Sequence, residues 1–149
     1  MNLKSKTLIK EKLKKNRRLL ALWAADCAEH VLHYFEKEYP KDNRPRKAIE
    51  TARAWAKKKI MLDEIRKVSL ASHAAARKSK DTSAIAAARS AGQAVATCHA
   101  ALHSLAAAGY AIKAVGIENS SKERKWQYKH LPKQLQSLIK KIKNDRLLT

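Results

Sequence analysis

The sequence predicts an all-α protein, a single bundle of five or six helices around a central alanine-rich helix, and three observations support this. Ala, Leu, Lys, Arg and Glu dominate the composition, and these residue types favour helices. Only three Gly, three Pro and one Phe occur in 149 residues, a composition that suits strands poorly. Residues 90–112 form a run without any charged side chain that is rich in alanine, which is typical of a buried helix.

Apolar residues recur at helical spacing along the N-terminal half. Between residues 19 and 39 they occupy one half of the helical circumference, and polar side chains occupy the other half. Pro45 suits the first turn of the next helix, where its missing N–H needs no partner. The helices expected in this half span residues 6–18, 19–39, 46–58 and 63–79.

Residues 84–115 are predicted to form the longest helix, which Gly116 ends. Because small apolar residues surround it on nearly all sides, it is placed at the centre of the bundle. Ser120 and Glu123 have the spacing of a capping box at the start of a short helix. Beyond Pro132, a basic helix is expected over residues 133–146.

The chain length is near the commonest size of a single domain, so we expect one helical domain over residues 1–149. Basic helical extensions are expected at about residues 1–18 and 120–149. The uncharged run is long enough to cross a bilayer, but alanine and polar residues make most of it up, so we predict a buried helix and no membrane span. Lysines interrupt the apolar residues at the N-terminus, so no signal peptide is expected and a cytoplasmic location is predicted.

The net charge is +20, from 33 Lys and Arg against 13 Asp and Glu. Residues 1–20 carry eight basic side chains and one acidic one, whereas residues 21–40 carry one basic and four acidic ones. A field of this strength attracts polyanions. A basic nucleic-acid-binding protein that contacts phosphates through its two ends is therefore one alternative for the function.

The sequence contains none of the motifs GxSxG, GxGxxG or GxxxxGK[ST], so no catalytic residue is predicted and nucleotide-binding phosphate loops are excluded. Cys27 and Cys98 lie among apolar residues and are expected to be buried thiols. The histidines near acidic residues leave a metal-binding helical bundle as a second alternative. Because neither HExxH nor a repeated ExxH pair occurs, no metal ligand and no cofactor is predicted.

His99 and His103 stand four residues apart on the expected central helix and would therefore share one face of it. A buried imidazole needs a hydrogen-bond partner, and Asp26, Glu29 or Tyr110 are the candidates. We expect His99, His103 and Tyr110 to form a buried polar contact between helices, with a ligand site as the alternative.

Several segments resemble a bacterial family of immunity proteins, which are predicted to protect a cell against toxins of the polymorphic type. The run WAADCAEH (residues 23–30) is followed by RPRKAIE (residues 44–50). The likeness continues in ASHAAAR (residues 71–77) and in AGQAVAT (residues 91–97), which precedes His99. In all, the resemblance covers roughly residues 20–116.

The resemblance implies an all-helical, non-enzymatic protein that neutralises a cognate toxin by direct contact. The shared segments place the expected contact residues on one polar helix face and on the turn that follows it. An inhibitor of a basic nuclease would be acidic, so this basic chain suits an acidic partner, or it binds through the acidic segment. The expected partner-binding residues are Asp26, Glu29, His30, His33, Arg44 and Arg46.

Overall fold

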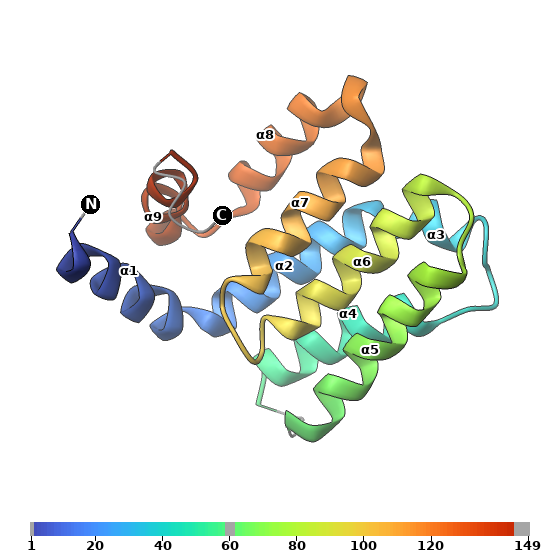
Figure 1. Cartoon of the computed structure of the whole chain (residues 1–149), viewed down its shortest axis with the longest axis horizontal. Coiled ribbons are helices and arrows are strands. Elements are labelled where there is room, and N and C mark those ends of the chain that lie inside the picture. Colours follow the sequence, from blue (N-terminus) through green and yellow to red (C-terminus); the bar gives the residue numbers. More distant parts are fainter. Residues whose placement is uncertain (1, 59–61, 145–149) are drawn as a thin grey trace.

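The computed structural model describes residues 2–58 and 62–144, and within these ranges the chain is helical and contains no strand (Figure 1). The all-α prediction is therefore confirmed. The helices are α1 (Leu3–Lys15), α2 (Arg17–Val31), α3 (His33–Glu36), α4 (Arg44–Ala56), α5 (Leu62–Lys78), α6 (Thr82–Ala96), α7 (His103–Val115), the 3-10 helix η1 (Ile117–Asn119), α8 (Ser120–His130) and α9 (Lys133–Asn144).

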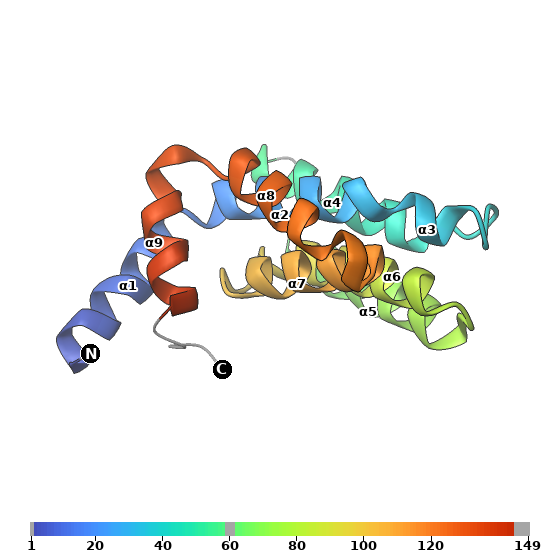
Figure 2. The same ribbon diagram turned by 90° about the horizontal axis from the view of Figure 1, so that it is seen from above.

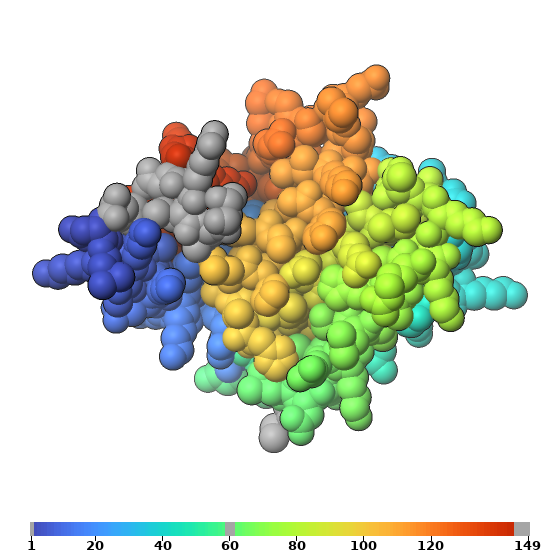
Figure 3. Space-filling model, viewed as in Figure 1, coloured from blue at the N-terminus to red at the C-terminus, as the bar shows by residue number. Residues whose placement is uncertain are grey.

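The main body has two layers (Figure 2). Helices α2, α3 and α4 lie in one layer, and α5, α6 and α7 lie in the other. Helix α6 contacts α2, α3, α4, α5 and α7, so an alanine-rich helix does lie at the centre. On the face shown in Figure 3, side chains of α7 lie between those of α1 at one end and those of α5 and α6 toward the other.

The prediction of one long helix over residues 84–115 is wrong. Helix α6 ends at Ala96, the chain turns over residues 97–102, and α7 runs back along α6 as a helical hairpin. A straight helix of that length would extend about 48 Å, which exceeds the size of a compact domain of this length. Folding back lets both alanine-rich halves bury their surfaces against each other.

Buried serines form hydrogen bonds between the helices of the layer made by α5, α6 and α7. The hydroxyl of Ser72 on α5 donates to the carbonyl of Ala88 on α6 at 2.8 Å, and that of Ser90 on α6 donates to Ala107 on α7 at 2.7 Å. Alanines along this interface, such as Ala91, are fully buried. Small side chains bring the backbones close enough for a short serine side chain to reach the neighbouring helix.

Two arginines at the start of α2 contact neighbouring segments, Arg18 in the same layer and Arg17 in the other layer. The guanidinium of Arg18 lies over the ring of Trp55, 4.7 Å from its centroid, and donates to the Trp55 carbonyl at 2.8 Å. This carbonyl lies in the last turn of α4 and also accepts from the N–H of Lys58 at 2.8 Å. Arg17 reaches the carbonyl of His99 in the turn between α6 and α7 at 3.4 Å.

The helix ends follow the sequence signals in most places. Pro45 lies in the first turn of α4, and Gly116 ends α7 with a φ of 84°, which favours glycine. Asp81 caps α6 by accepting from the N–H of Ala84 at 2.8 Å. The capping box predicted at Ser120 does not form, because the Glu123 carboxylate turns away toward α2.

Helices α1 and α9 lie beside the two layers, at the end where the chain begins (Figures 1 and 2). Both lie within the basic extensions expected from the sequence. Each buries a few apolar side chains, Ile9 and Leu13 from α1 and Leu135 and Ile139 from α9, which belong to the same cluster as Leu20 of α2. No described helix is long and apolar enough to cross a membrane.

Candidate functional site

The polar face of α2 lies beside α4, and an arginine joins the two helices. The guanidinium of Arg53 on α4 donates to Asp26 at 2.8 Å and to both carboxylate oxygens of Glu29 at 2.7 and 3.1 Å. The hydrogen bond from Arg53 holds the pKa of Glu29 below its ordinary value. Two of the acidic residues predicted for partner binding are thus already paired within the chain.

The same pairing continues toward the end of this layer. Arg46 on α4 makes a bidentate contact with Glu36 of α3, at 2.7 and 2.6 Å. Arg44, the first residue of α4, contacts both oxygens of Asp42 in the preceding loop, at 2.9 and 2.7 Å. Hydrogen bonds from Arg44 lower the pKa of Asp42. Planar guanidinium–carboxylate pairs of this kind fix both side chains in position.

On its other side, α2 is joined to α8 through His30. The Nδ1 of His30 lies 2.8 Å from Oε1 of Glu123, and because a carboxylate oxygen can only accept, the imidazole donates. The imidazole also stacks on Trp126, with ring centroids 3.7 Å apart and an interplanar angle of 4°. Trp126 stacks in turn on His130 at 4.1 Å, so three rings form a continuous column.

These side chains surround an open pocket of about 440 Å³ lined by Asp26, Glu29, His30, Trp126 and His130. Together with Arg53, the five lining residues define what we call the α2 strip. The strip runs from α4 across α2 to α8 and presents carboxylates, a guanidinium and stacked aromatic rings to solvent. Such a combination suits recognition of another surface.

The remaining predicted contact residues lie apart from the α2 strip. His33 is exposed at the start of α3, with its ring 4.2 Å from that of Tyr34. Arg46 lies where α4 meets α3, and Arg44 is the first residue of α4, paired with Asp42 of the preceding loop. The structure therefore brings Asp26, Glu29 and His30 together and leaves the other three predicted residues outside this pocket.

The expected pair of His99 and His103 does not form. Because residues 97–102 are a turn, His99 is exposed there and His103 begins α7. Nδ1 of His103 lies 2.7 Å from the Gln93 side-chain oxygen, so its partner is none of the three that we expected. Tyr110 is half-buried on α7. The prediction of a buried polar contact made by both histidines was wrong because it assumed one continuous helix.

A pair of polar side chains that the sequence did not single out, His73 and Arg89, lies between α5 and α6. The guanidinium of Arg89 donates to Nδ1 of His73 at 2.8 Å, which requires a neutral imidazole. Burial and the positive charge of Arg89 lower the pKa of His73, and burial lowers that of His103. The backbone of Gly92 packs directly against the His73 ring.

The model of one protein family, described as "Imm-5 like putative immunity protein", matches residues 11–134. The match covers most of the chain. The chain belongs to this family. Neither the curated proteins nor the solved structures contain a chain that matches it.

The segments that carry the likeness to the immunity family have defined positions in the fold. WAADCAEH lies on α2 and supplies Asp26, Glu29 and His30 to the strip. RPRKAIE begins α4 and supplies Arg46. The segments at residues 71–77 and 91–97 lie on α5 and α6, where His73 packs on Gly92. The shared residues therefore serve both the surface and the contact between helices.

Among the described residues of this immunity-family protein, no group of three or more His, Cys, Asp or Glu is arranged to hold a metal ion. Cys27 and Cys98 are buried, as the sequence predicted. Burial raises the pKa of both thiols, that of Cys98 to about 12, so neither is a reactive thiolate at neutral pH.

Sequence reasoning missed four members or neighbours of the strip, which are Arg53, Glu123, Trp126 and His130. Arg53 was visible only as part of a basic helix, and Glu123 only as a capping residue. Their partners lie far away in the chain, so no local spacing connects them. The signal that could have found Arg53 is the excess of acidic residues between positions 21 and 40, because partly buried carboxylates require cationic partners.

Proposed function

We propose that this protein is an immunity protein that binds a cognate toxin directly and thereby neutralises it, without catalysing a reaction. The membership in the immunity family over residues 11–134 is the observation that carries this proposal. The contact surface we propose is the α2 strip, extended by His33 of α3 and by Arg44 and Arg46 of α4.

The stacked rings of the α2 strip supply the anchor for such a contact. Trp126 is half-buried and stacks with both His30 and His130, so its position is fixed before a partner arrives. Aromatic residues held in this way contribute strongly to interfaces because little side-chain entropy is lost on binding. The adjoining pocket offers space for a side chain of the partner.

The internal ion pairs fix the positions of polar side chains on the proposed contact surface. Asp26 and Glu29 share Arg53, and Glu36 pairs with Arg46, so three of the four acidic side chains of this segment are paired within the chain. With a net charge of +20, the chain is complementary to a partner whose contacting surface is acidic. The paired side chains then orient the partner through hydrogen bonds. The positive electrostatic field of the chain increases the rate of association.

Co-expression with the products of neighbouring genes tests the proposal. The expected result is a 1:1 complex in size-exclusion chromatography and rescue of growth from one toxic neighbour. His130→Ala removes one exposed ring of the strip and is expected to weaken that complex by about tenfold. Lys129→Ala, at the adjacent exposed position of α8, is the matched control and should have little effect.

Variants of Glu36 and Arg46 test whether this ion pair has only a structural role or also contacts the toxin. Arg46→Glu places two acidic side chains together, and adding Glu36→Arg restores an ion pair with exchanged positions. If the pair contacts the toxin, the double variant recovers stability and still binds weakly. Failure of every toxic neighbour to form a complex, or full binding by His130→Ala and by the exchanged pair, would contradict the proposal.

Binding to nucleic acid is the second candidate, and the lysines of the outer helices favour it. Helix α1 carries six lysines and one glutamate, and α9 carries four lysines and no acidic residue. A salt titration with duplex and single-stranded oligonucleotides distinguishes the candidates. Binding that survives near-physiological salt supports a nucleic-acid function, whereas binding that disappears there reflects the charge alone.

A further inference from the structure

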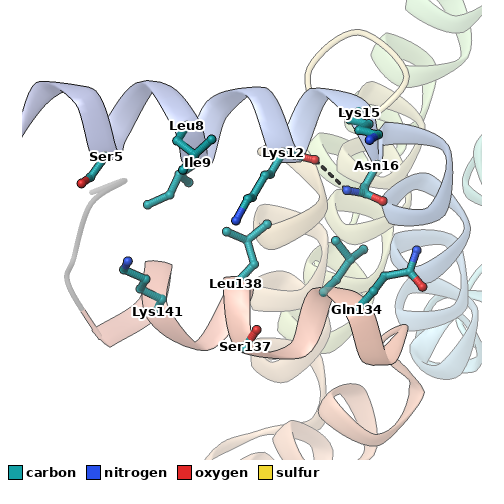
Figure 4. A pocket seen from close by; sticks show the side chains of 11 residues that line it. Ser5, Leu8, Ile9, Lys12, Lys15, Asn16, Gln134, Ser137, Leu138 and Lys141 are labelled. Atoms are coloured by element: carbon teal, nitrogen blue, oxygen red, sulfur yellow. Dashed lines mark hydrogen bonds between the residues drawn. The ribbon is translucent and has the colours of Figure 1, made fainter.

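A groove runs between α1 and α9, away from the α2 strip. Its volume is about 550 Å³, and it lies where the first and last described helices of the chain approach each other. The side chains of Ile9, Lys12, Leu138 and Lys141 point toward the space between the two helices (Figure 4).

The apolar lining of the groove comes from both helices. Ile9 and Leu135 are buried and form the base, and Leu138 is half-buried. Leu8 is 51% exposed although it lines the groove. Leucines on two facing helices that remain open to solvent provide a site where a further apolar side chain gains burial.

The charged lining of the groove is of one sign. Lys12, Lys15 and Lys141 line it, and none of its described lining residues is acidic. The Asn16 side chain donates to the Lys12 carbonyl at 2.8 Å and so caps the C-terminal end of α1 beside the groove. Three ammonium groups around an apolar base are complementary to an occupant that carries carboxylates beside apolar side chains.

The residues that line the groove also favour a protein occupant over a nucleic acid. No aromatic ring and no arginine is among the described lining residues, although bases stack on aromatic rings and arginine is the residue that binds phosphate bidentately. Aliphatic side chains between two helices instead match the apolar face of a third helix, with contacts at positions i, i+3, i+4 and i+7.

We propose that the groove between α1 and α9 binds an acidic amphipathic helix of the partner protein. Since the partner is the toxin, the inference rests on the proposed function and specifies the chemistry of the toxin segment. The family match begins at residue 11 and ends at residue 134, so Leu8, Leu138 and Lys141 lie outside it. The groove is therefore built from residues on both sides of these bounds, with Lys12 and Lys15 inside the matched region.

The test uses the full chain and synthetic peptides of about four helical turns. The first peptide has leucines along one face and glutamates on the others, and a second has the same composition in scrambled order. Fluorescence anisotropy measures both affinities near physiological salt. The amphipathic peptide is expected to bind at least about tenfold more tightly than the scrambled one, because only the first presents a continuous apolar face.

Variants of the chain locate the site. Lys12→Glu with Lys141→Glu is expected to weaken binding of the amphipathic peptide by about tenfold or more. Lys6→Glu with Lys133→Glu changes the net charge equally, at exposed positions of the same helices outside the groove, and should alter affinity by less than about threefold. Leu8→Ser is expected to weaken binding, whereas Leu3→Ser, at another exposed leucine of α1, is not.

Three results of the peptide measurements would overturn the inference. These are equal affinity for both peptides, equal effects of the two double-lysine variants, and displacement of the peptide by a single-stranded oligonucleotide at matched concentration. The last result would assign the groove to nucleic acid. The peptide measurements need no toxin, so they fail or succeed separately from the proposed function. If a toxin complex forms and Lys12→Glu with Lys141→Glu leaves it intact, the groove inference fails and the proposed function stands.

Discussion

The imidazole of His73 lies directly against the backbone of Gly92, where α5 meets α6. A Cβ atom added to Gly92 would lie 2.7 Å from Nε2 of His73, closer than such atoms normally approach. The glycine thus makes room for a ring that also accepts a hydrogen bond from Arg89. Both residues come from segments that resemble the immunity family, so this contact gives a physical reason for their types.

Gly92→Ala is expected to lower the free energy of unfolding by about 1–2 kcal/mol, because the His73 ring must move and the contact with Arg89 weakens. In a His73→Ala background the ring is absent, and the same change is expected to raise stability by about 0.5–1 kcal/mol through helix propensity. Urea unfolding of the four proteins measures both effects. The same sign in both backgrounds would contradict this explanation.

Stability is expected to fall as pH decreases through the ordinary histidine value of 6.5. The pKa values of His73 and His103 are lowered in the fold, so the unfolded chain binds protons there that the folded chain does not. The loss continues until pH reaches the lowered values. His73→Gln with His103→Gln should flatten this part of the curve, whereas His33→Gln, at an exposed position, should leave it unchanged. Chemical unfolding between about pH 7.5 and pH 5 measures the slope.

Arg53→Ala is expected to destabilise the protein at neutral pH by about 1 kcal/mol, since Asp26 and Glu29 both lose their cation and these side chains are half-exposed. The pKa of Glu29 is lowered in the fold, so its contribution is present above its ordinary value of 4.5 and disappears as pH falls through the lowered value. The two proteins should therefore converge in stability at acidic pH.

Lys47→Ala, which removes an exposed cation from the same helix, is the control for the Arg53 experiment. Its unfolding free energy should follow that of the unchanged protein at every pH. A stability difference for Arg53→Ala that persists below the lowered pKa of Glu29 would show that Arg53 acts through packing rather than through its ion pairs.

Ala91→Leu is expected to destabilise the protein by about 1–3 kcal/mol, because Ala91 is fully buried where α6 meets its neighbours and a larger side chain forces the helices apart. Ala106→Leu places the same side chain at a half-buried position of α7 and should change stability by less than about 0.5 kcal/mol. Thermal unfolding followed by circular dichroism compares them. Similar midpoints would mean that the alanine interface is loosely packed.

Local patterns in the sequence determined the secondary structure and the family. Composition indicated the all-α class, and helical spacing located α4 and α5 to within a few residues, whereas the helix predicted over residues 19–39 is divided into α2 and α3. Pro45 and Gly116 mark helix ends because their backbone preferences act within one turn. The burial of Cys27 and Cys98 followed from their apolar neighbours in the chain.

Only the tertiary structure decided where the alanine-rich run turns and which charges pair. No Gly or Pro marks residues 97–102, and the reversal arises because α7 gains burial by packing on α6. Arg53 meets Asp26, and Glu123 meets His30, across separations that local periodicity does not encode. Burial and pairing are properties of the assembled layers, and for this reason the α2 strip and the groove between α1 and α9 became visible only in the fold.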